Sequence, residues 1–244
     1  MRIIISPAKK MAADTDTLPA EGLPAFLAHT ERLKTALQGM SRQELQSLWK
    51  CNDAITAQNA ARLADMDLHR RLTPAVLAYE GIQYQYMAPR VMEIPQLDYL
   101  REHLRILSGF YGLLRPFDGV VPYRLEMQAR LAIDGCKDLY GFWDGLLART
   151  LADETDFILN LASKEYSRAV EPHLPGVSAW SPAPLGSAKT AGLWKKAPCA
   201  KWPGARWCAG WRRTISLPGR ISGRLTNWGI VFSVRCQTRA TTYF

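Results

Sequence analysis

Two segments of the sequence each place a hydroxyl side chain and a lysine directly after a short apolar run. Ser6 and Lys9 follow the first run, and Asn160, Ser163 and Lys164 lie at the end of the second. If the two runs form neighbouring parallel strands, these side chains meet at the carboxyl edge of one sheet, where α/β proteins bind ligands. Such a group suits the binding of an anion, although each segment alone also fits a helix cap followed by a solvated lysine.

A third segment, residues 123–127, alternates polar and apolar side chains as a strand does. This alternation places Arg124 and Glu126 on the face opposite Leu125. An arginine and a carboxylate two residues apart can hold a substrate and move its proton. They can equally form a salt bridge on a strand face. Arg124, Glu126 and Ser163 are therefore the candidate catalytic residues.

Two glycines, Gly109 and Gly112, precede Arg115. The apolar pattern before them predicts a helix over residues 97–107, and a helix that runs into Gly-x-x-Gly resembles the hairpin of a helix-hairpin-helix module. Glycine N–H groups can approach a DNA phosphate closely, and Arg115 would add a charge-assisted contact. A helix-ending glycine followed by a turn, with Arg115 and Asp118 paired on the surface, produces the same pattern.

Neither the histidines nor the cysteines show the spacing of a metal site. The four histidines are scattered, and the five cysteines include no Cys-x-x-Cys pair and are odd in number. We therefore predict no metal, no cofactor and no disulfide framework, which favours a reducing cytoplasm. No apolar run approaches the roughly 18–20 residues that cross a membrane, so we expect no membrane association.

Strands and amphipathic helices alternate over the first 180 residues without an internal repeat. Strands are predicted at residues 2–6, 75–79, 123–131, 157–162 and 176–180. Helices are predicted at residues 23–40, 41–49, 53–65, 97–107 and 139–151 and again from Ser163, with a capping box at Ser41-x-x-Glu44. The order indicates a mixed α/β (α+β) class, and we expect one compact domain and a monomer.

The positive charge of the chain lies entirely in its last part. Residues 1–180 carry 20 Lys and Arg against 22 Asp and Glu, whereas residues 181–244 carry 11 Lys and Arg and no acidic residue. These portions have net charges of −2 and +11, so the net charge of +9 is no evidence that the first 180 residues bind nucleic acid.

Residues 181–244 also differ in composition from the rest of the chain. They contain five of the eight tryptophans and show no sustained apolar period. A basic nucleic-acid-binding tail, a disordered segment and a translation of the wrong reading frame are the three interpretations. Basic tails and disordered segments are usually poor in tryptophan, which favours the third.

Several segments, in order along the chain, resemble signatures of the YaaA family of bacterial proteins. They are residues 5–9, 107–116, 122–127, 138–143 and 160–166. The resemblance implies a compact α/β domain of unusual topology with a basic cleft and a helix-hairpin-helix-like element. It also implies binding of double-stranded DNA and a role in limiting oxidative damage under peroxide stress.

The resemblance also bears on the tail. When its codons are read one base out of register, two separate places permit sequences similar to the family's Lys-x-Ala-Arg-Gly helix and Phe-Asp-x-x-Gly-Tyr-x-Phe strand. We therefore predict a YaaA-like domain over residues 1–180 and an out-of-frame, disordered basic tail over residues 181–244. The frame would change between about Trp180 and Ser187, and the chain would then lack part of its binding surface.

Two functions follow as hypotheses. The first is a cytoplasmic peroxide-stress protein that binds double-stranded DNA, with phosphate contacts from Lys9, Lys10, Gly109, Gly112, Arg115, Arg124 and Lys164. The second is an enzyme that acts on a nucleotide or small molecule in a pocket at the carboxyl ends of strands 2–6 and 157–162. Its pocket would contain Ser6, Lys9, Arg124, Glu126, Asn160, Ser163 and Lys164. A chain with an altered end can also be a non-functional product.

Overall fold

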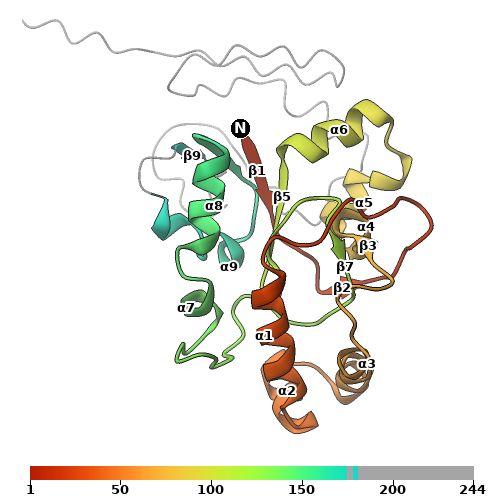
Figure 1. Cartoon of the computed structure of the whole chain (residues 1–244), viewed down its shortest axis with the longest axis vertical. Helices are drawn as coiled ribbons and strands as arrows, with labels where there is room; N and C mark the ends of the chain where they lie inside the picture. Colours follow the sequence, from red (N-terminus) through yellow and green to blue (C-terminus); the bar gives the residue numbers. More distant parts are fainter. Residues whose placement is uncertain (175–177, 181–244) are drawn as a thin grey trace, which may run out of the picture. The chain divides into compact units, whose positions relative to one another are not determined.

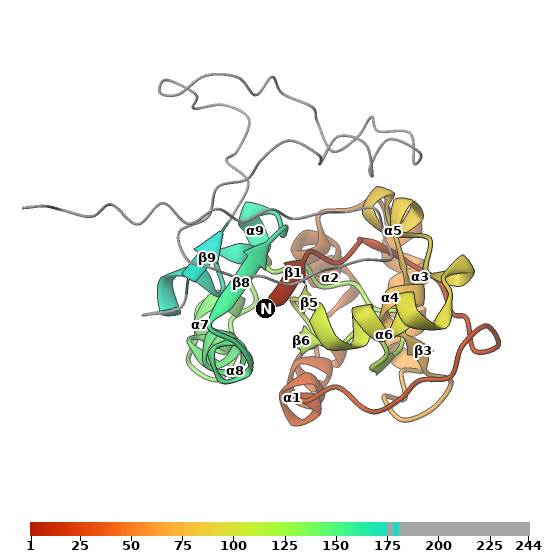
Figure 2. The same cartoon turned by 90° about the horizontal axis from the view of Figure 1, so that it is seen from above.

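A run of three isoleucines near the start of the chain forms the central strand of the main sheet. The structure is a computed structural model that describes residues 1–174 and 178–180. The predicted aberrant tail therefore lies outside the described residues. Figure 1 shows the arrangement of the elements, and Figure 2 shows it from above.

The main sheet has five strands in the order β6-β5-β1-β8-β9. Strands β1, β5, β8 and β9 run parallel, and β6 pairs with β5 in the antiparallel direction. Because Ile4 lies in register with both Arg105 and Asn160, β1 lies directly between β5 and β8, which are both distant from it in sequence. The strand bounds are Arg2–Ile5 for β1, Leu104–Ser108 for β5, Gly112–Leu114 for β6, Phe157–Asn160 for β8 and Ser178–Trp180 for β9.

Three helices lie together at one end of the described domain (Figure 1). They are α1 (Leu27–Gln38), α2 (Arg42–Trp49) and α3 (Asp53–Ala64). The predicted capping box is confirmed, since the Ser41 hydroxyl accepts the Glu44 N–H and the Glu44 carboxylate accepts the Ser41 N–H. This contact with Ser41 lowers the pKa of Glu44. A short turn with Lys50 in the left-handed conformation (φ 47°) joins α2 to α3 as a helical hairpin.

Shorter elements complete the described chain. Figure 2 shows α7 and α8 on the side of β8 and β9, and α6 on the side of β5. Small strand pairs join β2 (Lys10–Met11) to β4 (Tyr79–Glu80) and β3 (Thr73–Pro74) to β7 (Gly119–Val120). The helices are α4 (Ala75–Ala78), α5 (Ile82–Met87), η1 (Pro89–Val91), α6 (Ile94–His103), α7 (Leu139–Trp143), α8 (Leu146–Glu154), α9 (Lys164–Ser167) and η2 (Glu171–His173). No helix within the described ranges is both long and apolar enough to cross a membrane.

The mixed α/β class is confirmed, but several predicted boundaries are wrong. Residues 75–79 are mostly helix α4, and the predicted helix 139–151 breaks into α7 and α8 where Asp144 adopts φ 39°. Residues 123–131 form no strand. The alternation there reflects burial, because Tyr123, Leu125 and Met127 face the core while the backbone has no partner strand.

Two glycines that were expected on the surface lie in the core instead. The predicted helix 97–107 ends at His103, and Gly109 and Gly112 lie in the β5–β6 hairpin. Both glycines are buried. A side chain at Gly109 would lie 2.7 Å from the Leu125 carbonyl oxygen, and one at Gly112 (φ 75°) would lie 2.8 Å from Trp143. The prediction of a helix-hairpin-helix-like element here is therefore wrong, because the glycines allow close packing rather than access to phosphate.

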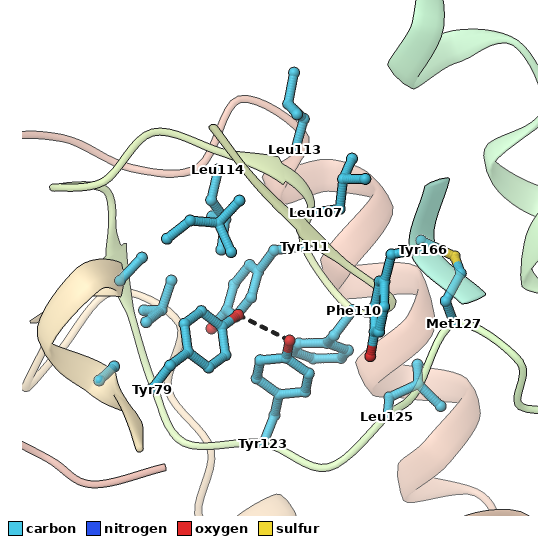
Figure 3. Close-up of a cluster of buried hydrophobic side chains, with 14 of the residues drawn as sticks. Tyr79, Leu107, Phe110, Tyr111, Leu113, Leu114, Tyr123, Leu125, Met127 and Tyr166 are labelled. Atoms are coloured by element: carbon cyan, nitrogen blue, oxygen red, sulfur yellow. Dashed lines mark hydrogen bonds between the residues drawn. The ribbon is translucent and has the colours of Figure 1, made fainter. Parts of the chain in front are cut away.

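Tyrosines fill the core beside this hairpin (Figure 3). The hydroxyls of Tyr79 and Tyr123 are 2.9 Å apart, and Ser108 Oγ lies 2.7 Å from the Tyr123 hydroxyl. Burial raises the pKa of Tyr123 to about 12. The indole N–H of Trp143 donates to the Gly109 carbonyl at 3.0 Å. These hydrogen bonds satisfy the polar atoms that the aromatic side chains carry into the core.

Candidate functional site

The carboxyl ends of β1 and β8 are joined by their two serines. The Ser163 N–H donates to Ser6 Oγ at 2.8 Å, and the Ser6 hydroxyl lies 3.2 Å from Ser163 Oγ. The Tyr84 hydroxyl donates to the Ser6 carbonyl at 2.8 Å. The two segments that sequence analysis paired are therefore in contact, because parallel neighbours bring their carboxyl ends to one edge.

One carboxylate at this edge forms ion pairs with two cationic side chains. Glu126 lies 2.9 Å from Lys9 Nζ and 3.1 Å from Arg124 Nη2. The Lys9 side chain is 63% exposed, whereas Arg124 and Glu126 are 14% and 16% exposed. Arg124 Nε is buried and has no hydrogen-bond partner among the described residues. The predicted pairing of Arg124 with Glu126 thus exists in a half-buried setting, where charge interactions are stronger than at an open surface.

A second carboxylate, Glu165, lies close to the first. The Gln128 N–H donates to Glu165 Oε1 at 3.3 Å. Burial raises the pKa of Glu165, and the negative charge of Glu126 raises it further. Two carboxylates in different environments can divide the roles of proton donor and acceptor. Glu165 was not among the predicted site residues, although its position directly after Lys164, in a segment that carries predicted site residues, was a usable signal.

We name Ser6, Lys9, Arg124, Glu126, Ser163 and Glu165 the carboxyl-edge cluster. Lys164 is exposed next to it in the chain, and the exposed Lys10 pairs with Glu80 at 2.7 Å. Asn160 has a different role from the one predicted. It is 2% exposed, donates to Glu171 at 2.8 Å and accepts the Ala162 N–H at 3.0 Å, so it shapes the turn after β8 rather than facing a ligand.

Three of the predicted phosphate contacts do not join this cluster. Gly109 packs against the backbone of Leu125 and Glu126, but both it and Gly112 are buried in the β5–β6 hairpin and so are not exposed to a phosphate. Arg115 follows β6, whose direction opposite to β5 carries it to the amino edge of the parallel strands. Among the described residues, the histidine, cysteine and acidic side chains form no group of three or more that could hold a metal ion.

The sequence of the described domain matches a family of known proteins. A family described as "Peroxide stress protein YaaA" matches residues 1–183. The chain belongs to the YaaA family. The match ends inside the interval, Trp180 to Ser187, where sequence analysis places the change of reading frame.

Curated relatives of this YaaA-family chain align with it over a stretch of similar length. A UPF0246 protein of Lachnoclostridium phytofermentans is 57% identical over 171 residues, which are 70% of this chain and 67% of the relative. UPF0246 proteins of Agathobacter rectalis and Pediococcus pentosaceus are 55% and 53% identical over 174 residues. These matches cover 71% of this chain and 70% and 69% of the two relatives. About a third of each relative therefore has no counterpart in the matched part of this chain.

Proposed function

We propose that this YaaA-family protein acts in peroxide defence by binding double-stranded DNA as a cytoplasmic monomer. The family match supports the role in peroxide stress. The observation that carries the DNA proposal is the grouping of Lys9, Lys10 and Lys164 around the carboxyl edge, where all three are exposed. Arg124 would contribute a fourth cation from a half-buried position.

The lysines of this edge can exchange partners. Lys9 and Lys10 pair with Glu126 and Glu80, but their side chains are 63% and 80% exposed. The exposed Lys10–Glu80 pair contributes little stability, and Glu126 keeps Arg124 as a partner when Lys9 turns away, so a phosphate can replace either carboxylate at small cost. Contacts of this kind carry no base readout, and we expect affinity without strong sequence preference.

The test is a triple variant, Lys9→Gln, Lys10→Gln and Lys164→Gln, in the full chain. We expect its affinity for a short DNA duplex, measured by fluorescence anisotropy, to fall at least tenfold. The slope of log affinity against log salt should also become shallower by about 3. The control carries Lys50→Gln, Arg70→Gln and Lys137→Gln, which removes the same charge from exposed positions elsewhere.

The positive charge of residues 181–244 requires a second measurement, because it can bind DNA by itself. Because residues 181–244 carry a net charge of +11, the same titrations are run on a chain that ends at residue 183. Equal losses in both triple variants, or binding that disappears with residues 184–244 alone, would exclude the carboxyl edge as the DNA contact.

We propose as a second candidate an enzyme acting on a nucleotide or small molecule at the carboxyl-edge cluster. The buried Nε of Arg124, which has no partner among the described residues, lies beside Glu126 and Glu165 and favours this candidate. An ordinary salt bridge at the surface would need neither a buried arginine nor a second carboxylate. In this candidate Arg124 orients the substrate, while the two glutamates and Ser163 donate protons to it and accept protons from it.

A nucleotide panel tests this candidate. Each common nucleoside triphosphate is incubated with the protein, and its conversion is followed by phosphorus NMR. We expect Glu126→Gln to abolish conversion while the unfolding midpoint moves little, and Arg124→Lys to raise KM more than it lowers kcat. Conversion that persists in Glu126→Gln, or none by the wild-type protein, would reject a nucleotide-converting enzyme.

A further inference from the structure

A cavity of about 310 Å³ lies at the amino edge of the sheet, away from the carboxyl-edge cluster. A volume of this size suits a small metabolite rather than a polymer. Three of its lining residues are arginines, which is an unusual density of guanidinium groups. The side chains that matter to its chemistry are Glu21, Arg101, Arg105, Arg115, Phe117 and Asp118.

Arg105 gives this cavity a buried cation. The residue is only 5% exposed, and its Nη2 lies 2.6 Å from Glu154. Its Nη1 donates to the Leu104 carbonyl at 2.6 Å. Its Nε is buried without a hydrogen-bond partner among the described residues. Nearly all buried donors in proteins are hydrogen-bonded, so this unsatisfied Nε is an exception, and it belongs to a residue that lines the cavity.

Arg115 supplies a second guanidinium from the residue that follows β6, the strand next to β5. Its backbone N–H donates to Asp118 at 2.8 Å, which holds the turn that carries it. Its side chain is exposed and forms no ion pair within the described part of the chain. Arg115 is therefore available to a ligand, unlike Lys9 and Lys10 of the carboxyl edge, which already have carboxylate partners.

The remaining arginine forms part of the wall. Arg101 pairs with Glu21 at 2.7 Å and stacks its guanidinium 4.7 Å from the centre of the Phe117 ring. Arg101 also pairs with Asp98, so it has two carboxylate partners and its plane is covered, whereas Arg105 shares its one partner, Glu154, with Arg2. Arg101 therefore fixes the shape of the cavity rather than binding a ligand. Arg105 and Arg115 thus remain the two groups with donors to offer.

We propose that this amino-edge cavity binds a small molecule carrying a phosphate or carboxylate group, with Arg105 and Arg115 as the anion receptors. Guanidinium groups match both anions by paired N–H donors in one plane. Burial of Arg105 lowers the local dielectric and strengthens its contact with an anion. Glu21 and Asp118 repel negative charge, so they limit the ligand to one anionic group of modest charge. They can also accept hydrogen bonds from donor groups elsewhere on the ligand.

The test uses inorganic phosphate and acetate as probes on the full chain, with binding followed by NMR chemical shifts and calorimetry. We expect a dissociation constant on the order of 1 mM for the better probe. Arg115→Gln should weaken binding about tenfold or more, because an exposed side chain can be removed without unfolding the domain. Arg105→Lys, which keeps the charge but loses the planar donors, should weaken it as well.

Two controls separate this cavity from the DNA proposal. The lysine triple variant of the carboxyl edge should bind phosphate as the wild-type protein does, and Arg115→Gln should bind the short duplex normally. Loss of phosphate binding in the lysine triple variant, with none in Arg115→Gln, would overturn the proposal. Absence of binding by either probe at 20-fold above the expected constant would overturn it too, whatever the outcome for DNA.

Discussion

The two edges of the main sheet hold their charges in different ways. At the carboxyl edge, exposed lysines pair with half-buried carboxylates, and the partners come from three separate segments. At the amino edge, the buried Arg105 is held by Glu154 and by backbone carbonyl groups. Lysines on an exposed edge can exchange partners easily, whereas a buried guanidinium keeps a fixed geometry. The first arrangement suits a large polyanion, and the second suits one small anion.

The largest effect should come from the hairpin between the two edges. Gly112→Ala places a side chain at φ 75° and 2.8 Å from Trp143, so we expect a loss of about 3–4 kcal/mol of unfolding free energy. Both edges should then lose binding together, which urea denaturation and the two binding assays would reveal. Gly135→Ala is the matched control, because Gly135 has φ 78° but no neighbour within 4 Å. Equal losses in the two variants would show that packing against Trp143 is unimportant.

Asp118→Asn should alter the amino edge alone. Burial raises the pKa of Asp118 to about 6, so the folded protein binds a proton that the unfolded chain releases near pH 4. The contribution of Asp118 to the stability of the folded protein is therefore greatest below pH 4. This contribution is lost as the pH rises to about 6. At pH 7.5 we expect Asp118→Asn to increase stability by about 1–2 kcal/mol, and near pH 4 to change it little. Urea denaturation at both pH values measures this, and a gain of equal size at both would contradict it.

Ser6→Ala should affect only the carboxyl edge. The change removes the acceptor of the Ser163 N–H and the contact between the two hydroxyls, which we expect to cost about 1 kcal/mol. Ser163→Ala removes the hydroxyl contact but leaves its own N–H bonded, so its effect should be smaller. Thermal unfolding of both variants compares them. A larger loss in Ser163→Ala would mean that the backbone contact does not hold the strand ends together.

The smallest effect concerns the two glutamates. Glu126→Gln removes a negative charge near Glu165, so the pKa of Glu165 should fall but stay above its usual range, because burial is the larger cause. A carbon NMR titration of the glutamate carboxyl groups follows this directly. The stability of the protein should change by less than about 1 kcal/mol. An unchanged pKa would show that the two carboxylates act independently.

Sequence analysis predicted the carboxyl edge better than the amino edge. Ser6 and Ser163 each follow an apolar run, so their meeting required only that the runs be parallel neighbours, which β1 and β8 are. The capping box at Ser41 is a local signal and was equally readable. Glu165 was missed because its significance depends on Glu126, which approaches it only in three dimensions.

The residues of the amino edge show no sequence pattern that predicts their meeting. Arg105 lies in a segment whose apolar residues fit a helix as well as a strand, so its burial in β5 was not foreseen. The sequence around Gly109 and Gly112 does not distinguish a surface position from a core position, because close packing and phosphate access both require glycine. Contacts with Leu125 and Trp143, distant in sequence, decide between the two.

The position of β1 has a consequence for the order in which the protein assembles during synthesis. Its residues leave the ribosome well before those of its hydrogen-bonding neighbours, which are residues 104–106 and 158–160. The first strand must therefore wait for more than 150 further residues before both of its sides are paired. Such long separations slow folding and prolong the exposure of an unpaired apolar strand. A nascent chain halted before β8 should present β1 as a site for chaperone binding or aggregation.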